Sequence, residues 1–185
     1  TGPFSVQDDV LVVGDLFITA KGCLPSSLHT QDDWLADFVR SEPTVRLEDD
    51  LLTLTGEDAT LVFLAREVAD PDRPLTGRLW TIDRLLCHIP IGIPTGVNPT
   101  VTFNDDGTVV IETGCNTGYG TYVATDTELS FSQIAYTRMA CFVPEAGAVE
   151  SHVQEVLAPG TATNTIEAAR LTIERDSTGI VANTE

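Results

Sequence analysis

Short stretches of alternating or uniformly apolar residues recur along the chain and are separated by polar turns. Alternation with a period of two is typical of a β-strand that buries one face. The stretches with a strand-like pattern are Leu52–Leu54, Leu61–Leu64, Gly77–Leu85, Thr100–Phe103, Thr108–Ile111 and Leu171–Ile173. Between two of them, Asn104–Gly107 ends in Asp-Gly, which supplies the positive φ of a tight hairpin turn. The pattern therefore predicts a fold built mainly from antiparallel strands.

Two further stretches space their apolar residues at i, i+3 and i+4, which is the pattern of a short amphipathic helix. They lie at Trp34–Val39 and at Val149–Leu157. Thr30, followed by Asp33, resembles a capping box and predicts the start of the first helix, whereas Pro144 suits the first turn of the second. The expected fold class is mainly β (α+β), with one short helix in each half of the chain.

The two halves of the chain repeat one another. Val10–Cys23 aligns with Glu128–Cys141 without a gap, at an offset of 118 residues. In both halves the matched cysteine is followed by a helix-like stretch, then by an alternating strand and a further strand. This shared order predicts two copies of one supersecondary unit.

The first copy is incomplete, because the position equivalent to Asn116 falls before Thr1. We therefore predict about one and a half repeats: residues 1–67 as the C-terminal part of a first domain, 68–74 as a linker, and 75–185 as a complete second domain. A partial first domain is expected to leave strand edges that a partner chain or another segment can pair.

Several motifs in the second half follow one another in a specific order. They are Leu75-Thr76-Gly77-Arg78-Leu79-Trp80, Gly114-Cys115-Asn116, Gly120-Thr121-Tyr122 and Thr137-Arg138-Met139-Ala140-Cys141. Together they resemble the META domain, also called the HslJ-like domain, as a tandem whose second copy is complete and whose first is truncated at its N-terminus. The first copy departs from the pattern, since it has Ala20-Lys21-Gly22-Cys23 where the second copy has Arg138-Met139-Ala140-Cys141.

The resemblance implies a small antiparallel β-barrel-like fold with one helix. It also implies an extracytoplasmic setting, in the cell envelope, the periplasm or the medium, in some members as a lipoprotein, and a link to stress responses. No enzymatic activity is established for the family. The motif residues to which it assigns a structural role are Trp80, Gly114, Cys115, Asn116, Thr137, Arg138, Met139, Ala140 and Cys141.

The four cysteines, Cys23, Cys87, Cys115 and Cys141, fit neither a CxxC metal pattern nor a dense disulfide scaffold. Their spacing leaves both disulfides and buried free thiols open. The family pattern, together with an extracytoplasmic location, allows a disulfide between Cys115 and Cys141, with two buried thiols as the alternative. A pairing of Cys23 with Cys87 also stays open.

Composition narrows the classes of partner. Asp and Glu total 28 against 10 Lys and Arg, which gives a formal net charge of -18. Such a charge repels phosphate backbones and anionic lipid, so neither nucleic acid nor a membrane surface is expected as a partner. No apolar run approaches the roughly 20 residues of a transmembrane helix. The chain begins without Met or a signal-peptide pattern, which favours a mature or excised segment.

No catalytic, cofactor-binding or metal-ligating set is predicted. The glycines of Gly114–Gly120 lack the lysine of a phosphate loop, and tight bends in a barrel explain them better. The histidines share no metal-ligand spacing, and the conceivable nucleophile pairs, Cys141 with His152 and Cys87 with His88, lack an orienting third group. The acidic clusters contain no calcium-loop pattern.

These observations favour a non-catalytic, stress-related binding module of the cell envelope or a secreted one, with an unknown protein or small ligand and no cofactor. One alternative is a proteinase inhibitor that presents the loop Cys87–Pro99, because Pro90, Pro94 and Pro99 would pre-order it. A second alternative, an enzyme acting on envelope polymers, lacks any suitable constellation of residues.

Overall fold

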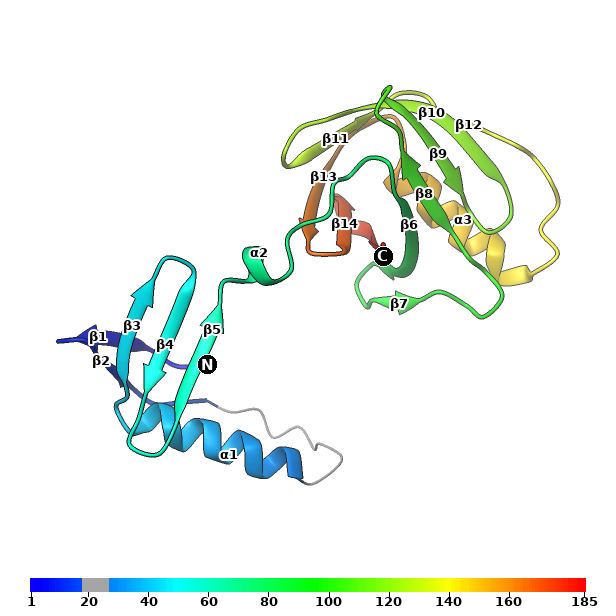
Figure 1. Ribbon diagram of the computed structural model, residues 1–185. Coiled ribbons are helices and arrows are strands. Elements are labelled where there is room, and N and C mark those ends of the chain that lie inside the picture. The colour runs from blue at the N-terminus through cyan, green and yellow to red at the C-terminus, as the bar shows by residue number, and fades with distance from the viewer. Residues whose placement is uncertain (18–26) are drawn as a thin grey trace. The chain divides into compact units, whose positions relative to one another are not determined.

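The computed structural model describes residues 1–17 and 27–185. The chain divides into two compact units, Thr1–Asp70 and Pro71–Glu185, called here the N-terminal and C-terminal units (Figure 1). Cys23, whose pairing the sequence left open, lies outside the described residues.

The C-terminal unit is a closed antiparallel β-barrel of eight strands. In order around the barrel they are β6 (Leu79–Leu86), β8 (Thr100–Phe103), β9 (Thr108–Glu112), β10 (Thr117–Ala124), β11 (Glu128–Phe131), β13 (Gly160–Glu167), β14 (Arg170–Arg175) and β15 (Thr178–Asn183), which returns to β6. Two short strands are added at its sides, β7 (Ile91–Gly92) on β6 and β12 (Ala135–Tyr136) on β10. The predicted fold class is confirmed, and closure leaves the barrel strands without free edges.

The barrel interior is filled by alternate residues of these strands. Trp80, Phe103, Ile111 and Leu129 are fully buried there. The Trp80 indole N–H donates to the carbonyl of Leu75 at 2.8 Å, so this motif residue is a core residue whose only polar group is satisfied.

One helix, α3 (Pro144–Val156), completes this core. It packs against β6, β14 and β15 and buries Val149, Val153 and Val156. It begins at Pro144, as predicted, where the missing N–H of proline costs no helical hydrogen bond. The spacing of its apolar residues thus identified the face that meets the barrel.

The N-terminal unit is an open antiparallel sheet with one long helix. Its strands, in spatial order, are β1 (Phe4–Gln7), β2 (Val10–Val13), β3 (Thr44–Glu48), β4 (Leu51–Thr55) and β5 (Thr60–Leu64). The helices are α1 (Ser27–Arg40) and the single turn α2 (Arg66–Ala69), which overlaps the start of the segment expected to be a linker.

The predicted start of the first helix at Thr30 is wrong, because α1 already begins at Ser27. Threonine and aspartate also occur on exposed helix surfaces, and Thr30 and Asp33 are both exposed here. A capping-box pattern alone therefore did not locate this helix end.

The open sheet repeats the register of five barrel strands. Its order β1-β2-β3-β4-β5 corresponds to β10-β11-β13-β14-β15. Phe4 opposite Val13 corresponds to Tyr122 opposite Phe131 at an offset of 118. Val45 opposite Leu54 corresponds to Asn164 opposite Ile173 at an offset of 119, and the same offset holds for all pairs among β3, β4 and β5. The offset changes from 118 to 119 because the segment between β11 and β13 is one residue longer than the segment between β2 and β3.

Candidate functional site

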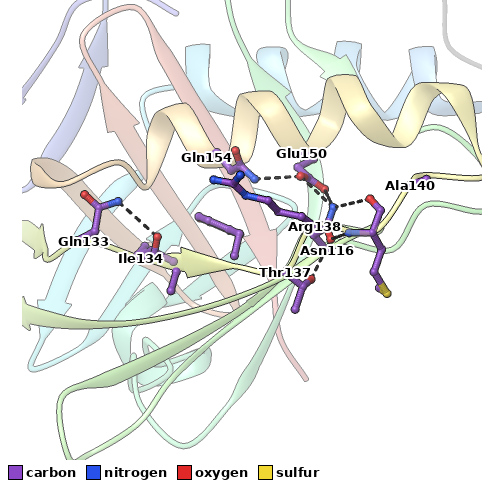
Figure 2. Close-up of a pocket in the computed structure, with 11 residues that line it drawn as sticks. Asn116, Gln133, Ile134, Thr137, Arg138, Ala140, Glu150 and Gln154 are labelled. Carbon is purple, nitrogen blue, oxygen red and sulfur yellow. Dashed lines mark hydrogen bonds between the residues drawn. The ribbon is translucent and has the colours of Figure 1, made fainter.

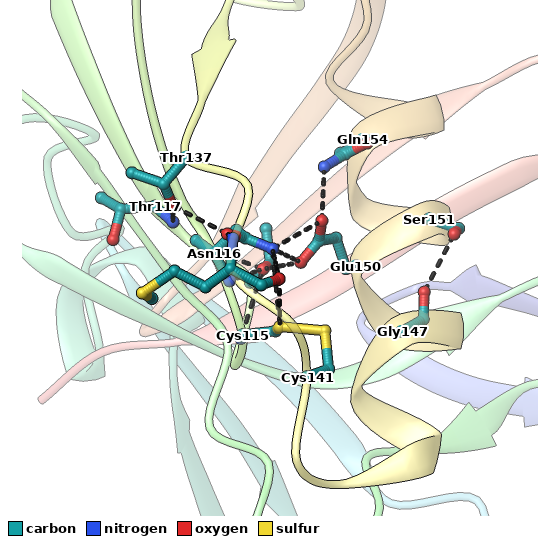
Figure 3. The surroundings of a disulfide bond; sticks show 11 residues. Cys115, Asn116, Thr117, Thr137, Cys141, Gly147, Glu150, Ser151 and Gln154 are labelled. Carbon is teal, nitrogen blue, oxygen red and sulfur yellow. Dashed lines mark hydrogen bonds between the residues drawn. A yellow bond between two sulfur atoms is a disulfide. The ribbon is translucent and has the colours of Figure 1, made fainter.

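A disulfide joins Cys115 to Cys141, with the two Cα atoms 5.4 Å apart (Figure 3). It ties the turn between β9 and β10 to the segment that leads into α3. The prediction of this pairing is confirmed. The sulfur of Cys141 is therefore not available as a nucleophile for His152, whose Nε2 instead lies 2.8 Å from the carbonyl oxygen of Gly179.

Asn116, next to the disulfide and only 4% exposed, binds the same segment through its side-chain amide. Its Oδ1 accepts hydrogen bonds from the hydroxyl of Thr137 at 2.8 Å and from the backbone N–H of Met139 at 2.7 Å. Its Nδ2 donates to the carbonyl of Met139 at 3.3 Å. The structure thus brings the two family motifs together, and the side chain of Asn116 links them. We call these hydrogen bonds of Asn116 the brace.

The brace continues onto α3 through Glu150. The carboxylate of Glu150 accepts from Asn116 Nδ2, with its two oxygens 3.2 and 3.0 Å away, and from Gln154 Nε2 at 3.0 Å. The hydroxyl of Thr113 lies 2.9 Å from the same carboxylate. Glu150 lies one turn from the buried Ala146 and from the buried Val153, and a charged residue at this apolar spacing was the signal in the sequence that reasoning from motifs missed.

Two glycines of Gly114–Gly120 are required by geometry. Gly114 has a φ of +87°, and a Cβ there would also collide with the side chain of Val97. A Cβ on Gly118 would collide with the ring of Tyr136, which the short strand β12 lays against β10. Turn geometry and close packing therefore account for these glycines without a bound phosphate.

An open groove of about 850 Å³ lies beside this brace (Figure 2). Its walls come from the segment around β12 and from α3, and its floor includes Asn116 and Glu150. The lining residues are Asn116, Gln133, Ile134, Ala135, Tyr136, Thr137, Arg138, Met139, Ala140, Glu150 and Gln154. The predicted motif residues Thr137 to Ala140 thus form one rim, whereas Trp80 and Gly114 do not line the groove.

Two hydrogen-bond donors in the groove have no partner within the part of the chain that is described. The guanidinium of Arg138 is exposed and makes no hydrogen bond or ion pair there. The hydroxyl of Tyr136 is buried and lacks a partner as well. Because the Tyr136 hydroxyl is buried, the exposed guanidinium of Arg138 is the donor that a bound molecule in the groove can reach.

The pKa of Tyr136 is raised to about 12, first by burial and then by the negative charge of Glu150. In an ultraviolet titration of tyrosinate we expect Tyr136 to ionise about 2 pH units later than a free tyrosine, whose pKa is ~10. Because the folded pKa exceeds the unfolded one, the associated stability is complete below pH ~10. The free energy of unfolding should then fall by about 2 kcal/mol as the pH rises towards 12. The variant Tyr136→Phe should lack the late step; a late step that persists would contradict the assignment.

Cys115, Cys141 and Glu150 each place one potential metal-ligand atom within 4.8 Å of the others. Thiolates are the metal-binding form of cysteine, and both sulfurs are here bonded to each other. The cluster therefore does not offer a metal-ligand set in this state.

The thiol of Cys87 donates to the carbonyl of Ile89 at 3.0 Å, in place of an interaction with His88.

The proline-containing loop Cys87–Pro99 is tied to the barrel over much of its length. Strand β7 within it pairs with β6, and Val97 is buried in the core. The backbone N–H of Ile82 also donates to the carbonyl of Pro99 at 2.9 Å. Its large apolar side chains Ile89 and Ile91 are nevertheless exposed, at 74% and 54%.

None of the helices in the described residues is both long and apolar enough to cross a membrane.

Comparisons with known proteins give the following matches. The sequence profile of the META domain matches residues 73–185. A protein from Burkholderia xenovorans, solved by NMR, is similar with a TM-score of 0.49 and 22% identity, over 60% of this chain and 83% of that one. A second protein solved by NMR is similar with a TM-score of 0.47 and 20% identity, over 57% of this chain and 87% of that one. No curated protein matches the chain.

Proposed function

This chain belongs to the META domain family, and from that premise we propose that it is a non-catalytic binding module that works outside the cytoplasm, as a cell-envelope or secreted protein with a role in stress. The disulfide between Cys115 and Cys141 indicates an oxidising compartment, because such bonds persist there and are reduced in most cytosols. The net charge of -18 argues against nucleic acid as the partner.

The N-terminal unit is, in this proposal, the C-terminal part of a second META-like barrel. Its strand order and register match those of β10, β11 and β13–β15, and α1 stands between β2 and β3 as α3 stands between β11 and β13. The chain thus carries one whole barrel and five strands of another, which agrees with the repeat in the sequence.

The observation that supports the binding function is that most motif residues at the groove are bonded to one another, whereas Arg138 is not. The family motif residues Cys115, Asn116, Thr137 and Cys141 are occupied with each other, so they shape the groove and are not free to react. Arg138 projects beside this brace with its donors unused (Figure 2). Guanidinium groups recognise carboxylates by paired hydrogen bonds, so we assign to the groove a ligand that presents a carboxylate.

A screen with a defined probe set tests this assignment. Short peptides and small organic acids are screened against the full chain by ligand-observed NMR. We expect the variant Arg138→Gln to weaken binding of the hits about tenfold or more, since a charge-assisted hydrogen bond contributes about 1.5 kcal/mol or more. Arg170→Gln is the matched control, because Arg170 is an exposed arginine on β14 and does not line the groove. Equal losses in both variants, or none in either, would refute the assignment.

A panel of proteinases separates this proposal from the inhibitor alternative. The loop Cys87–Pro99 is held against the barrel by β7 and Val97, so we expect no proteinase of the panel to be inhibited. Tight inhibition that Ile89→Asp abolishes would favour the inhibitor instead, because Ile89 is 74% exposed on that loop.

A further inference from the structure

Among the described residues, one cluster brings two cysteines and a carboxylate together: Cys115, Cys141 and Glu150 (Figure 3). One ligand atom of each lies within 4.8 Å of the other two, and all three side chains are half-buried. Glu150 also lines the open groove, which gives the cluster an approach from solvent. Two sulfurs bonded to each other are poor metal ligands, whereas two thiolates and a carboxylate are a sufficient set of protein ligands for Zn²⁺.

The two cysteines are held near each other by contacts besides the disulfide. Asn116 follows Cys115, and its Oδ1 accepts hydrogen bonds from the hydroxyl of Thr137 and from the N–H of Met139, two residues before Cys141. Opening of the sulfur–sulfur bond loosens this segment, but the hydrogen bonds of the brace limit how far the two sulfurs move apart. A metal ion therefore meets thiols that are already close.

Glu150 is oriented towards the cysteines by its own hydrogen bonds. Asn116 and Gln154 donate to its Oε1 at 3.2 and 3.0 Å, and Asn116 also donates to its Oε2 at 3.0 Å. The hydroxyl of Thr113 has one proton for two acceptors, Oε2 of Glu150 at 2.9 Å and the carbonyl of Asn116 at 2.8 Å. When it donates to the carbonyl, Oε2 keeps a lone pair for a metal. Hydrogen bonds of this kind fix the orientation of a ligating carboxylate.

The charge of the cluster favours a divalent cation. Two thiolates beside the carboxylate of Glu150 would place three negative charges close together, and a bound Zn²⁺ offsets two of them. The formal net charge of the chain, -18, also attracts cations. Thiolates favour zinc over magnesium or calcium, because the latter two ions prefer oxygen ligands.

We propose that a dithiol reductant converts the disulfide into a Zn²⁺ site formed by Cys115, Cys141 and Glu150. The dithiol supplies two electrons and two protons and becomes a disulfide itself, and the two thiol protons of the protein are released when Zn²⁺ binds the sulfurs. The sulfurs separate to about 3.8 Å, as Zn–S bonds of about 2.3 Å at a tetrahedral angle require, and water takes the fourth position. In an oxidising compartment the disulfide is the resident state, so Zn²⁺ binding follows exposure to the reductant. The proposal does not depend on the ligand assigned to the groove.

A zinc titration of the full chain in two redox states tests the site. The parent for this test carries Cys23→Ser and Cys87→Ser, so that Cys115 and Cys141 are its only thiols. It is reduced with a phosphine without air, freed of reductant, and titrated with Zn²⁺ against a chromophoric chelator. We expect the reduced chain to take a single equivalent of Zn²⁺ from the chelator and the oxidised chain to take none. Cys141→Ser should abolish binding.

Two glutamate variants on α3 test the third ligand. Glu150→Gln should weaken Zn²⁺ binding to the reduced chain about tenfold or more, a loss of the size seen when groups around a metal site are removed. Glu155→Gln is the matched control, because it removes the same charge from an exposed residue of the same helix. Co²⁺ in place of Zn²⁺ should give thiolate-to-metal absorption in the reduced parent, a signal that carboxylates alone do not produce.

The fold of the reduced chain is followed by the near-ultraviolet circular dichroism of Trp80, which is fully buried. Zn²⁺ should raise the urea midpoint of the reduced chain and leave that of the oxidised chain unchanged, because a ligand that binds the folded state stabilises it. A Trp80 signal that disappears on reduction and does not return with Zn²⁺ would refute the proposal.

Three further results would overturn the site. The first is a reduced, folded chain that takes no Zn²⁺ from the chelator. The second is equal binding in the oxidised and reduced states, which would show that the sulfurs are not ligands. The third is an equal effect of Glu150→Gln and Glu155→Gln, which would leave only a pair of thiols. None of these results bears on the Arg138→Gln experiment.

Discussion

The variant Asn116→Asp is expected to lower the free energy of unfolding of the C-terminal unit by about 3 kcal/mol or more at neutral pH. Asn116 is 4% exposed, and its Nδ2 donates to both oxygens of Glu150, at 3.2 and 3.0 Å. The substitution keeps the acceptor that binds Thr137 and Met139 but replaces the donor by a second carboxylate oxygen. Two negative charges then face each other across a hydrogen-bond distance in a site with little access to water.

The loss should shrink as the pH falls towards 4, because one of the two carboxyl groups then takes up a proton and becomes a donor again. Urea denaturation at neutral and acidic pH measures both effects. Asn98→Asp is the control, since it makes the same chemical change at an exposed residue. A variant at position 116 that unfolds like the parent at neutral pH, or a deficit that does not depend on pH, would contradict the role given to Asn116.

Removal of the disulfide by Cys115→Ala with Cys141→Ala is expected to cost about 3 kcal/mol of stability. The bond closes a loop with a sequence separation of 26 residues, and the chain-entropy model assigns about 3 kcal/mol to a loop of that size. Urea denaturation of the parent and the double variant, both without reductant, provides the measurement. Cys87→Ala serves as control, because Cys87 forms no disulfide with another described residue. Equal midpoints for parent and double variant would contradict the prediction.

The disulfide and Asn116 hold the same segment, so their contributions should not add. Cys115, Asn116 and Glu150 meet within one network around the loop before α3 (Figure 3). Contacting residues commonly show coupling energies of at least about 0.5 kcal/mol in a double-mutant cycle. We expect such a coupling between Asn116→Asp and the cysteine pair, with the combined loss smaller than the sum, since either change already releases the segment.

Much of the architecture was predictable because it depends on local sequence. The turn Asn104–Gly107 joins β8 to β9, Pro144 opens α3, and the apolar spacing of Val149 and Val153 identified the buried helix face. The disulfide was anticipated from the family pattern and not from the spacing of the cysteines, because spacing does not say which thiols meet in space. The start of α1 was missed, since polar residues inside a helix resemble those at its cap.

The sequence by itself predicted the mainly β fold, the two longer helices and the family, because these depend on periodicity and on short motifs read along the chain. Only the tertiary structure decided that β6 meets β15 and β10 meets β11 to close eight strands, since pairing between distant segments depends on packing in three dimensions. It also decided that Glu150 joins the brace of Asn116 and that Phe4 and Phe63 remain exposed. An apolar side chain has the same pattern in sequence whether or not another strand covers it, so only the fold distinguishes a filled barrel from an open face.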